Sequence, residues 1–177
     1  MLFKPLALAT VVLSALQVRA TDTAKNIVVP PLHEITISTT EYVDKMEKLT
    51  PENVVYEGPK VYANIKTLTN VIRVASGRIS DIKGAVLSDN DQSFITDALI
   101  TAAYAEISFL KDLLAKHDLL TKGGIASIGE AIRCMKSFDD PYGDRLIALI
   151  PHFQSSVEDG FKELTAVYEA LLNAYPA

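Results

Sequence analysis

The chain has no tryptophan, no Asn-x-Ser/Thr glycosylation sequon and a single cysteine, Cys134, among its 177 residues. One cysteine excludes an intramolecular disulfide, the covalent link on which many small secreted domains rely. The fold must therefore be held together by an apolar core. Hydrophobic residues make up 49% of the chain, which is enough to build a large one.

Positive charge is also scarce, with 17 Lys and Arg against 22 Asp and Glu and a formal net charge of −5. The basic residues form no stripe or cluster along the sequence. Nucleic acids and anionic membranes attract proteins through such clusters. We therefore expect neither of them as a partner.

Signatures of catalysis are missing as well, because the chain contains no GxSxG, P-loop or GxGxxG motif. His33, His117 and His152 lie far apart and form neither HxxxH nor HExxH, whereas zinc requires several ligands at close quarters. Cys134 is interpreted as a small core residue of an apolar helix. The sequence predicts no catalytic residue, no metal site and no cofactor, and so a protein that is not an enzyme.

The first 20 residues are typical of a secretory signal peptide. Lys4 precedes an uncharged run from Pro5 to Val18, and small residues at 18 and 20 predict cleavage after Ala20. A membrane anchor is the alternative, but the run is shorter than the roughly 20 apolar residues that span a bilayer. Cleavage would leave 15 basic and 22 acidic residues, a net charge of about −7.

The predicted domain organisation is a signal peptide at 1–20, an extended lead-in at 21–31 and a helical bundle domain at 32–177. The lead-in is predicted because Pro30-Pro31 disfavours helix before it. Hydrophobic spacing then predicts helices over about 32–49, 60–84, 89–117, 125–138 and 141–174.

Local breaks separate these helices. The YEGP stretch at 56–59 is predicted to be a break in helical structure before the helix over 60–84. Asp139-Asp140-Pro141 is predicted to cap and begin a new helix. Asp89 and Asp91 are likewise expected at a helix N-terminus, where they oppose the helix dipole. The fold class is all-α: a single-domain bundle of five helices, or six if Pro151 divides the last.

One helix carries a regular apolar seam, "KVYANIKTLTNVIRVASGRISDI" at 60–82, with apolar residues at 61, 65, 68, 72, 75, 79 and 82. A partner chain, the protein's own helices or a bound ligand could cover it. Alanine at 75 and flanks of Thr, Ser and Asn argue against a long coiled coil. We expect the seam to face other helices of the chain, in a core that is solid rather than hollow because protein interiors are normally filled.

Three sequence blocks bear on whether the core is solid or hollow: "VVYEGPKVYANIKTLTNVI", "LLAKHDLLTKGGIASIGEAI" and "DRLIALIPHFQSSVEDGFKELTAVYEALLNAY". In order and spacing they resemble the fungal hydrophobic surface binding protein A (HsbA) family, which includes cell-wall galactomannoproteins of the Mp1p type. The likeness covers about residues 32–175. It implies a secreted, all-helical, non-enzymatic protein that adsorbs to hydrophobic surfaces, helps to recruit secreted hydrolases, or encloses a fatty acid in an apolar tunnel.

Two departures from the family pattern bear on partners. The chain lacks a Ser/Thr-rich tail, and His117 stands where the family tends to have lysine. We accordingly expect a protein that is secreted and extracellular, or only loosely associated with the cell wall.

With the resemblance included, we expect a fatty acid or other lipid in the bundle interior. Tyr62, Tyr104 and Tyr168 are candidate hydroxyl donors to its carboxylate, unless their tips lie at the bundle surface. The alternative is a solid-core interaction or effector module that binds another protein. The residues predicted to line a ligand are Ile65, Leu68, Ile72, Ile79, Phe94, Ala98, Phe109, Leu113, Ile128, Ile132, Phe153, Phe161, Leu164 and Tyr168.

Overall fold

The computed structural model describes residues 4–82, 87–125 and 127–176, with side chains from residue 25 onward except that of Asp81. These residues form helices and turns and no strand. The elements are α1 (Lys4–Glu47), α2 (Val54–Ile79), the 3-10 turn η1 (Ser80–Ile82), α3 (Asp89–Ala115), α4 (His117–Lys122), α5 (Ile128–Leu149) and α6 (Gln154–Ala174). The predicted all-α bundle is confirmed, with six α-helices among the described residues.

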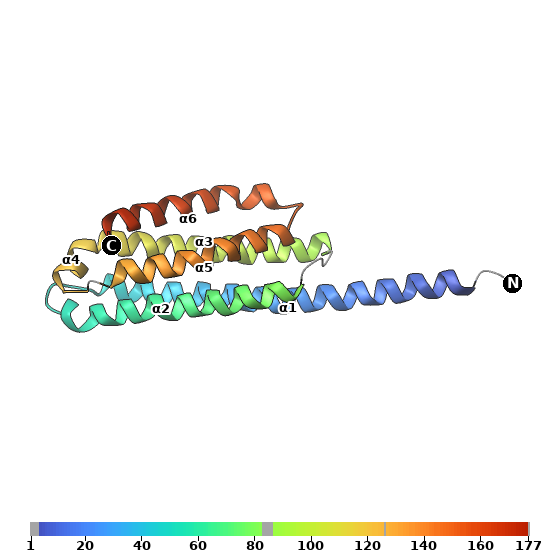
Figure 1. Cartoon of the computed structure of the whole chain (residues 1–177), viewed down its shortest axis with the longest axis horizontal. Helices are drawn as coiled ribbons and strands as arrows, with labels where there is room; N and C mark the ends of the chain where they lie inside the picture. Colours follow the sequence, from blue (N-terminus) through green and yellow to red (C-terminus); the bar gives the residue numbers. More distant parts are fainter. Residues whose placement is uncertain (1–3, 83–86, 126, 177) are drawn as a thin grey trace.

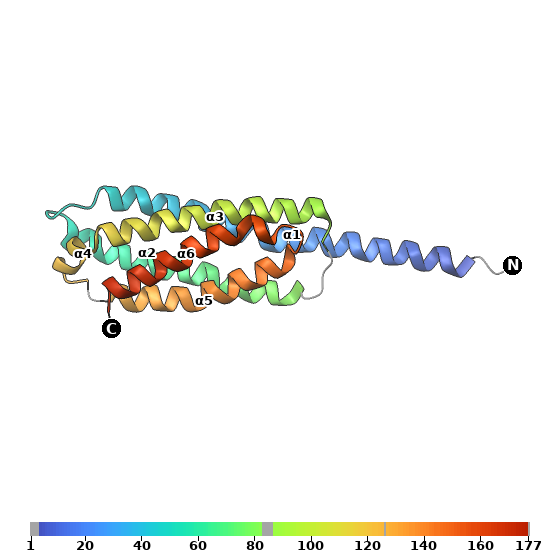
Figure 2. The same ribbon diagram turned by 90° about the horizontal axis from the view of Figure 1, so that it is seen from above.

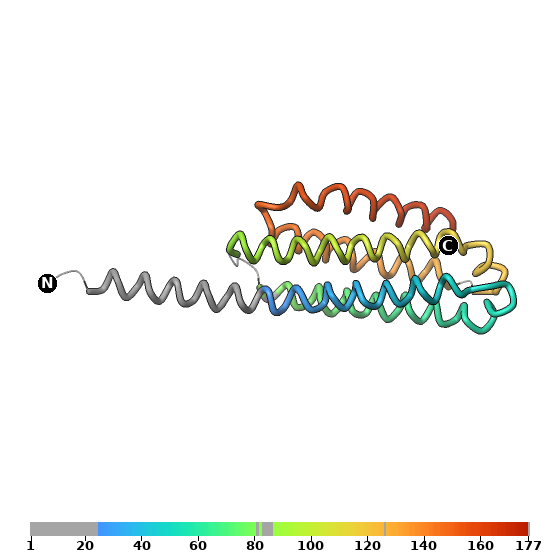
Figure 3. Tube along the Cα trace, turned by 180° about the vertical axis from the view of Figure 1, so that it is seen from behind, coloured from blue at the N-terminus to red at the C-terminus, as the bar shows by residue number. Residues whose placement is uncertain are grey.

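The five long helices close into a ring. Helix α1 packs against α2 and α3, α5 packs against α2 and α6, and α6 completes the circuit against α3 (Figures 1 and 2). Seen from behind, α6 lies on one side of α3 and α5, while α1 and α2 lie on the other (Figure 3). The α5–α6 contact is the least extensive in the ring. A five-helix ring has more interior to fill than a four-helix bundle, so its core needs long apolar seams from every helix.

The apolar seam on α2 faces this interior. Ile65, Leu68 and Ile72 have no exposed surface, and the other seam residues at 61, 75, 79 and 82 are at most 8% exposed. Helices α1 and α5 of the same chain cover the seam. The expectation that the protein's own helices bury it is confirmed.

Helix α3 is the most apolar helix with described side chains. By length and composition it could cross a membrane, with a mean hydropathy of 1.3 over its best 18 residues. More than half of that window, 56%, is buried inside the bundle against α1 and α6. This burial gives its apolar composition a structural explanation.

The N-terminal part of the bundle differs from the prediction. The lead-in expected to be extended over 21–31 is helical, because α1 runs through Pro30 and Pro31. Inside a helix each proline has no N–H to donate and its ring crowds the carbonyl one turn earlier, so continuing the helix has a local cost. Burial of Val28 and Leu32, at 0% and 1% exposure, favours continuing the helix into the core.

Two predicted breaks are also wrong. Helix α2 already begins at Val54 and runs through the YEGP stretch, and α5 runs without interruption through Asp139-Asp140-Pro141. In α5 the buried side chains of Met135 and Leu146 lie on either side of Pro141, so one continuous helix buries both. The predicted helix start at Asp139 therefore lies in the middle of a helix.

Other boundaries agree with the sequence. Helix α5 ends at Leu149 and α6 begins at Gln154, so Pro151 divides the last segment as expected. Asp89 and Asp91 lie in the first turn of α3, where the Ser88 hydroxyl accepts a hydrogen bond from the Asp91 N–H at 3.2 Å. Gly84, where the predicted helix over 60–84 ends, lies outside the described residues.

Candidate functional site between α3, α5 and α6

Most residues predicted to line a ligand lie in the bundle core. Seven of them have no exposed surface: Ile65, Leu68, Ile72, Phe109, Leu113, Ile128 and Ile132. Ile79, Ala98, Leu164 and Tyr168 are also buried, and Phe153 and Phe161 pack half-buried against the core. The sequence therefore identified the interior surface well.

Phe94 is the exception. It is 49% exposed on α3, and the Lys25 ammonium lies 3.9 Å from its ring centroid. Its predicted inward position is wrong. A phenylalanine near the start of a helix satisfies the helical spacing yet lies outside the core when the neighbouring helix presents a charged side chain there.

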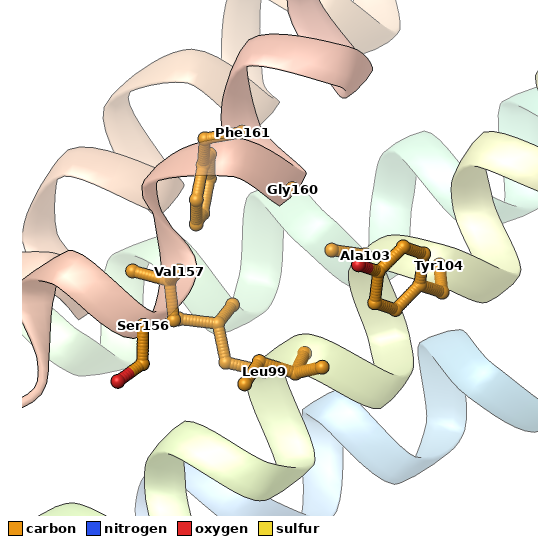
Figure 4. A pocket seen from close by; sticks show the side chains of 8 residues that line it. Leu99, Ala103, Tyr104, Ser156, Val157, Gly160 and Phe161 are labelled. Carbon is orange, nitrogen blue, oxygen red and sulfur yellow. The ribbon is translucent and has the colours of Figure 1, made fainter.

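Two small cavities lie where α6 meets α3 and α5. The first, of about 20 Å³, separates α3 from α6, and Figure 4 shows Leu99, Ala103 and Tyr104 of α3 facing Val157, Gly160 and Phe161 of α6. The second, also about 20 Å³, lies deeper. Its lining residues are Ile35, Leu99, Ala102, Ala103, Glu106, Asp139, Tyr142, Gly143, Leu146, Phe161 and Leu164. Only Phe161 and Leu164 of the predicted lining set border these two cavities.

An open groove adjoins the cavities on the outside of the α5–α6 seam, by which we mean the line along which α5 and α6 touch. It has a volume of about 440 Å³ and is lined by residues of these two helices, including Ile147, Phe161 and Glu169. Phe161 is common to the groove and to both cavities. Its ring therefore separates the outer groove from the interior.

Gly143 on α5 makes room for that ring. A β-carbon at this position would lie 2.5 Å from Cε1 of Phe161, closer than packed carbon atoms approach. A residue larger than glycine would force either the ring or the α5–α6 spacing to change. The glycine thus fixes where Phe161 closes the seam.

The deeper cavity is bordered by buried acidic and phenolic side chains. The Tyr168 hydroxyl donates a hydrogen bond of 2.6 Å to the Glu106 carboxyl, and both residues are at most 3% exposed. Asp139 and Tyr142 of α5 lie in the wall of the same cavity. We refer to Glu106, Asp139, Tyr142 and Tyr168 as the acid–phenol cluster.

Burial controls the ionisation of this cluster. It raises the pKa of Glu106 to about 7, although the hydrogen bond from Tyr168 acts in the opposite direction. Burial, together with the nearby carboxyls of Glu106 and Asp140, holds the pKa of Asp139 well above its usual range against the lowering effect of Lys136. Glu106 is therefore mainly neutral below about pH 7, and Asp139 keeps its proton to a higher pH than usual; a neutral carboxyl can donate a hydrogen bond.

The Tyr142 hydroxyl is a buried group of the cluster that forms no hydrogen bond with the described residues. Tyr142 as a whole is 2% exposed. An unsatisfied buried hydroxyl costs about 1–3 kcal/mol. Because its side chain borders the cavity, a polar atom placed there could satisfy it.

The three tyrosines considered as hydroxyl donors have different surroundings. Tyr168 is 1% exposed and bonded to Glu106, so the alternative of a tip at the bundle surface is wrong for it. Tyr104 is 55% exposed, and Tyr62 is half-buried beside a shallow pocket of about 180 Å³ between α2 and α5. Cys134 borders that pocket and is exposed, so its predicted core position is wrong.

Sequence reasoning did not identify Glu106 or Asp139. The available signal was their spacing. Glu106 lies three residues after Ala103 and four before Leu110, and Asp139 lies four after Met135 and seven before Leu146, all of them buried. A charged residue on an apolar stripe is an expected marker of a buried polar site.

In the described part of the chain, no three His, Cys, Asp or Glu side chains come together as a metal site would need.

Comparisons with known proteins give one informative likeness. No protein-family model matches the sequence, and no curated protein matches it. Among solved structures, the chain is similar to AfMp4p, whose crystal structure was determined in complex with palmitic acid, with a TM-score of 0.74. The alignment covers 86% of this chain and 99% of that one at 16% identity. At this identity the likeness establishes a shared fold.

Proposed function

We propose that this chain is a secreted, non-enzymatic protein that binds a fatty acid or similar single-chain lipid inside its helical ring. The observation that carries the proposal is the shared fold with AfMp4p, which holds palmitic acid and aligns over 99% of its length. The sequence resemblance to the HsbA and Mp1p-type family points in the same direction. Membership of that family is part of the proposal.

The ring interior suits an acyl chain chemically. Its walls are aliphatic and aromatic side chains from all five long helices. Each methylene transferred from water to such an apolar interior contributes about 0.8 kcal/mol of favourable free energy, so a long chain could bind tightly without a strong polar contact.

Entry of the chain requires side chains to move, because the two interior cavities each hold only about 20 Å³. The α5–α6 seam is the best place for this movement, since its contact is the least extensive in the ring. Displacement of the Phe161 ring would join the outer groove to both cavities. The acyl chain would then lie between α3, α5 and α6.

The decisive experiment is native mass spectrometry of protein purified without delipidation, followed by titration of stripped protein with a fluorescent fatty acid. We expect co-purified masses of long-chain fatty acids, and saturable uptake at one site per chain. Protein that carries no lipid and takes up no fluorescent fatty acid would exclude the proposal.

A solid-core module that binds another protein remains the second candidate. The observation that favours it is the small volume of the two interior cavities, which matches a normally packed interior. It predicts that fatty acids leave the melting temperature unchanged. A ligand that binds only the folded state at 100 times its dissociation constant should instead stabilise it by about 2.7 kcal/mol.

Secretion is a further part of the proposal, with cleavage after Ala20. Among the residues with described side chains, Val28 is the first that belongs to the core, so cleavage would leave those core side chains in place. Expression in a eukaryotic secretion host should yield a protein whose first residue is Thr21 on N-terminal sequencing.

Adsorption to hydrophobic surfaces belongs to the proposal as well, together with the recruitment of a secreted hydrolase. Val55 and Tyr56 at the start of α2 are 61% and 76% exposed, and they form an adjacent apolar pair. Depletion of the protein from solution by polystyrene beads, compared for the natural sequence and Val55→Ser/Tyr56→Ser, tests whether this pair contributes.

A further inference from the structure

We propose that the deeper cavity, where Glu106, Asp139 and Tyr142 meet, holds the head group of the lipid and accepts it in an uncharged form, as a protonated carboxylic acid or an alcohol. This inference rests on the proposed lipid binding and adds the position and the chemistry of the head group.

The first argument is the distribution of polar atoms around the cavity. Eight of its lining residues are apolar or glycine, and the polar ones are Glu106, Asp139 and Tyr142. A cavity with an apolar wall and one polar region matches an amphiphile, whose chain needs burial and whose head needs hydrogen bonds.

The second argument is the Tyr142 hydroxyl. Tyr142 is 2% exposed and its hydroxyl has no partner among the described residues, whereas the hydroxyl of the equally buried Tyr168 is bonded to Glu106 at 2.6 Å. Buried hydroxyls almost always have a partner. A ligand oxygen in the cavity would supply one for Tyr142.

The third argument concerns charge. Ionisable side chains in and beside the cluster come from three helices: Glu106 from α3, Tyr168 from α6, and Lys136, Asp139, Asp140 and Tyr142 from α5. Helix α1 contributes the apolar Ile35 to the cavity wall. The one base among them, Lys136, is bonded to both Asp140 carboxylate oxygens at 2.6 and 2.8 Å.

An ionised head group would therefore enter a buried region that holds two carboxyls and whose one base already has a partner. Mutual repulsion and desolvation both oppose it. A neutral head group meets no such cost, because a protonated carboxyl or an alcohol can accept from Tyr142 and also exchange a hydrogen bond with Glu106 or Asp139.

The two head groups should respond differently to pH. A fatty acid loses its proton as the pH rises, and the Glu106 pKa of about 7 means that this residue ionises over the same interval. Both changes weaken the binding of the acid. An alcohol keeps its proton over this range and can donate a hydrogen bond to an ionised Glu106, so its binding should change little.

The test is displacement of a neutral fluorescent probe, N-phenyl-1-naphthylamine, by dodecanoic acid and by dodecanol at pH 5 and pH 8. For the natural sequence we expect the affinity for dodecanoic acid to fall at least tenfold and that for dodecanol to change less than twofold. Tyr142→Phe should weaken both ligands about fivefold to tenfold, as expected for one lost hydrogen bond. Glu106→Gln should make the affinity for the acid depend less on pH.

Tyr62→Phe is the control for position: the sequence made Tyr62 a candidate donor to the head group, but Tyr62 lies outside this cavity, so the proposed position requires that the substitution leave both affinities unchanged. Equal affinity for the acid at both pH values, or no effect of Tyr142→Phe on either ligand, would overturn the inference and leave lipid binding intact. Failure of both ligands to displace the probe at either pH would overturn the lipid-binding proposal itself. Tyr142→Phe removes a hydroxyl that has no partner among the described residues, so its melting temperature should confirm that the variant is folded.

Discussion

The ring of Phe161 lies against Gly143, so close that a β-carbon on Gly143 would be 2.5 Å from Cε1 of Phe161. Phe161 belongs to α6 and Gly143 to α5, and the ring borders the outer groove as well as both interior cavities. This one contact closes the seam through which we propose that a lipid enters. It can be opened or blocked by single substitutions.

Phe161→Ala should speed the uptake of a fluorescent fatty acid, measured by stopped-flow, while lowering the free energy of unfolding by about 2 kcal/mol. The loss should be smaller than the 3–5 kcal/mol typical of fully buried phenylalanine because this ring is half-buried. Leu172→Ala is the matched control, since Leu172 is also half-buried on α6 but does not border the cavities or the groove. Uptake that is equally fast in both variants would exclude Phe161 as the closing residue.

Gly143→Ala should lower the melting temperature because the added methyl group displaces the Phe161 ring or separates α5 from α6. In the double variant Gly143→Ala/Phe161→Ala the clash is absent, so the two effects should be less than additive in a thermal denaturation cycle. Strict additivity would mean that the two residues do not interact.

Tyr168→Phe and Tyr142→Phe should have opposite consequences although both remove one buried phenol hydroxyl. Tyr168→Phe removes a hydrogen bond from the buried Glu106 and should cost about 1–3 kcal/mol in urea denaturation. Tyr142→Phe removes a hydroxyl that has no partner among the described residues, so the lipid-free protein should be as stable or more stable. A large loss of stability in Tyr142→Phe would show that its hydroxyl is already satisfied.

The stability of the lipid-free protein should fall as the pH rises from 5 to 8. The pKa of Glu106 is raised to about 7 in the folded state from 4.5, so between these values the folded state binds more protons than the unfolded state. The stabilisation is complete below about pH 4.5 and is lost as Glu106 ionises, and Asp139 acts in the same direction. Thermal denaturation across this range should be less pH-dependent in Glu106→Gln, and flatter still with Asp139→Asn added.

Cys134 should react in the native protein, because its side chain is exposed. Ellman's reagent should titrate one thiol per chain without denaturant. A reaction that begins only on unfolding would return Cys134 to the core position that the sequence had predicted.

The helical class, the seam on α2 and the division at Pro151 were all predictable, because each depends on local periodicity or on the lost N–H of proline. The breaks predicted at Pro59 and Pro141 were wrong for a tertiary reason: buried residues on both sides of each proline favour one continuous helix. In the same way, the exposure of Phe94 and Cys134 depends on which helix lies opposite, and the sequence carries no local record of that.

The site was predictable only in part. Its apolar walls followed from helical spacing, but Glu106 and Asp139 lie 33 positions apart and become a cluster only when α6 closes the ring between α3 and α5. Thus the sequence by itself determined which faces of the helices are apolar, since residues spaced by three and four positions lie on the same face of a helix with 3.6 residues per turn. The tertiary structure decided which faces meet, where Phe161 closes the seam and which charged groups lose their water, because those depend on contacts between residues far apart in the chain.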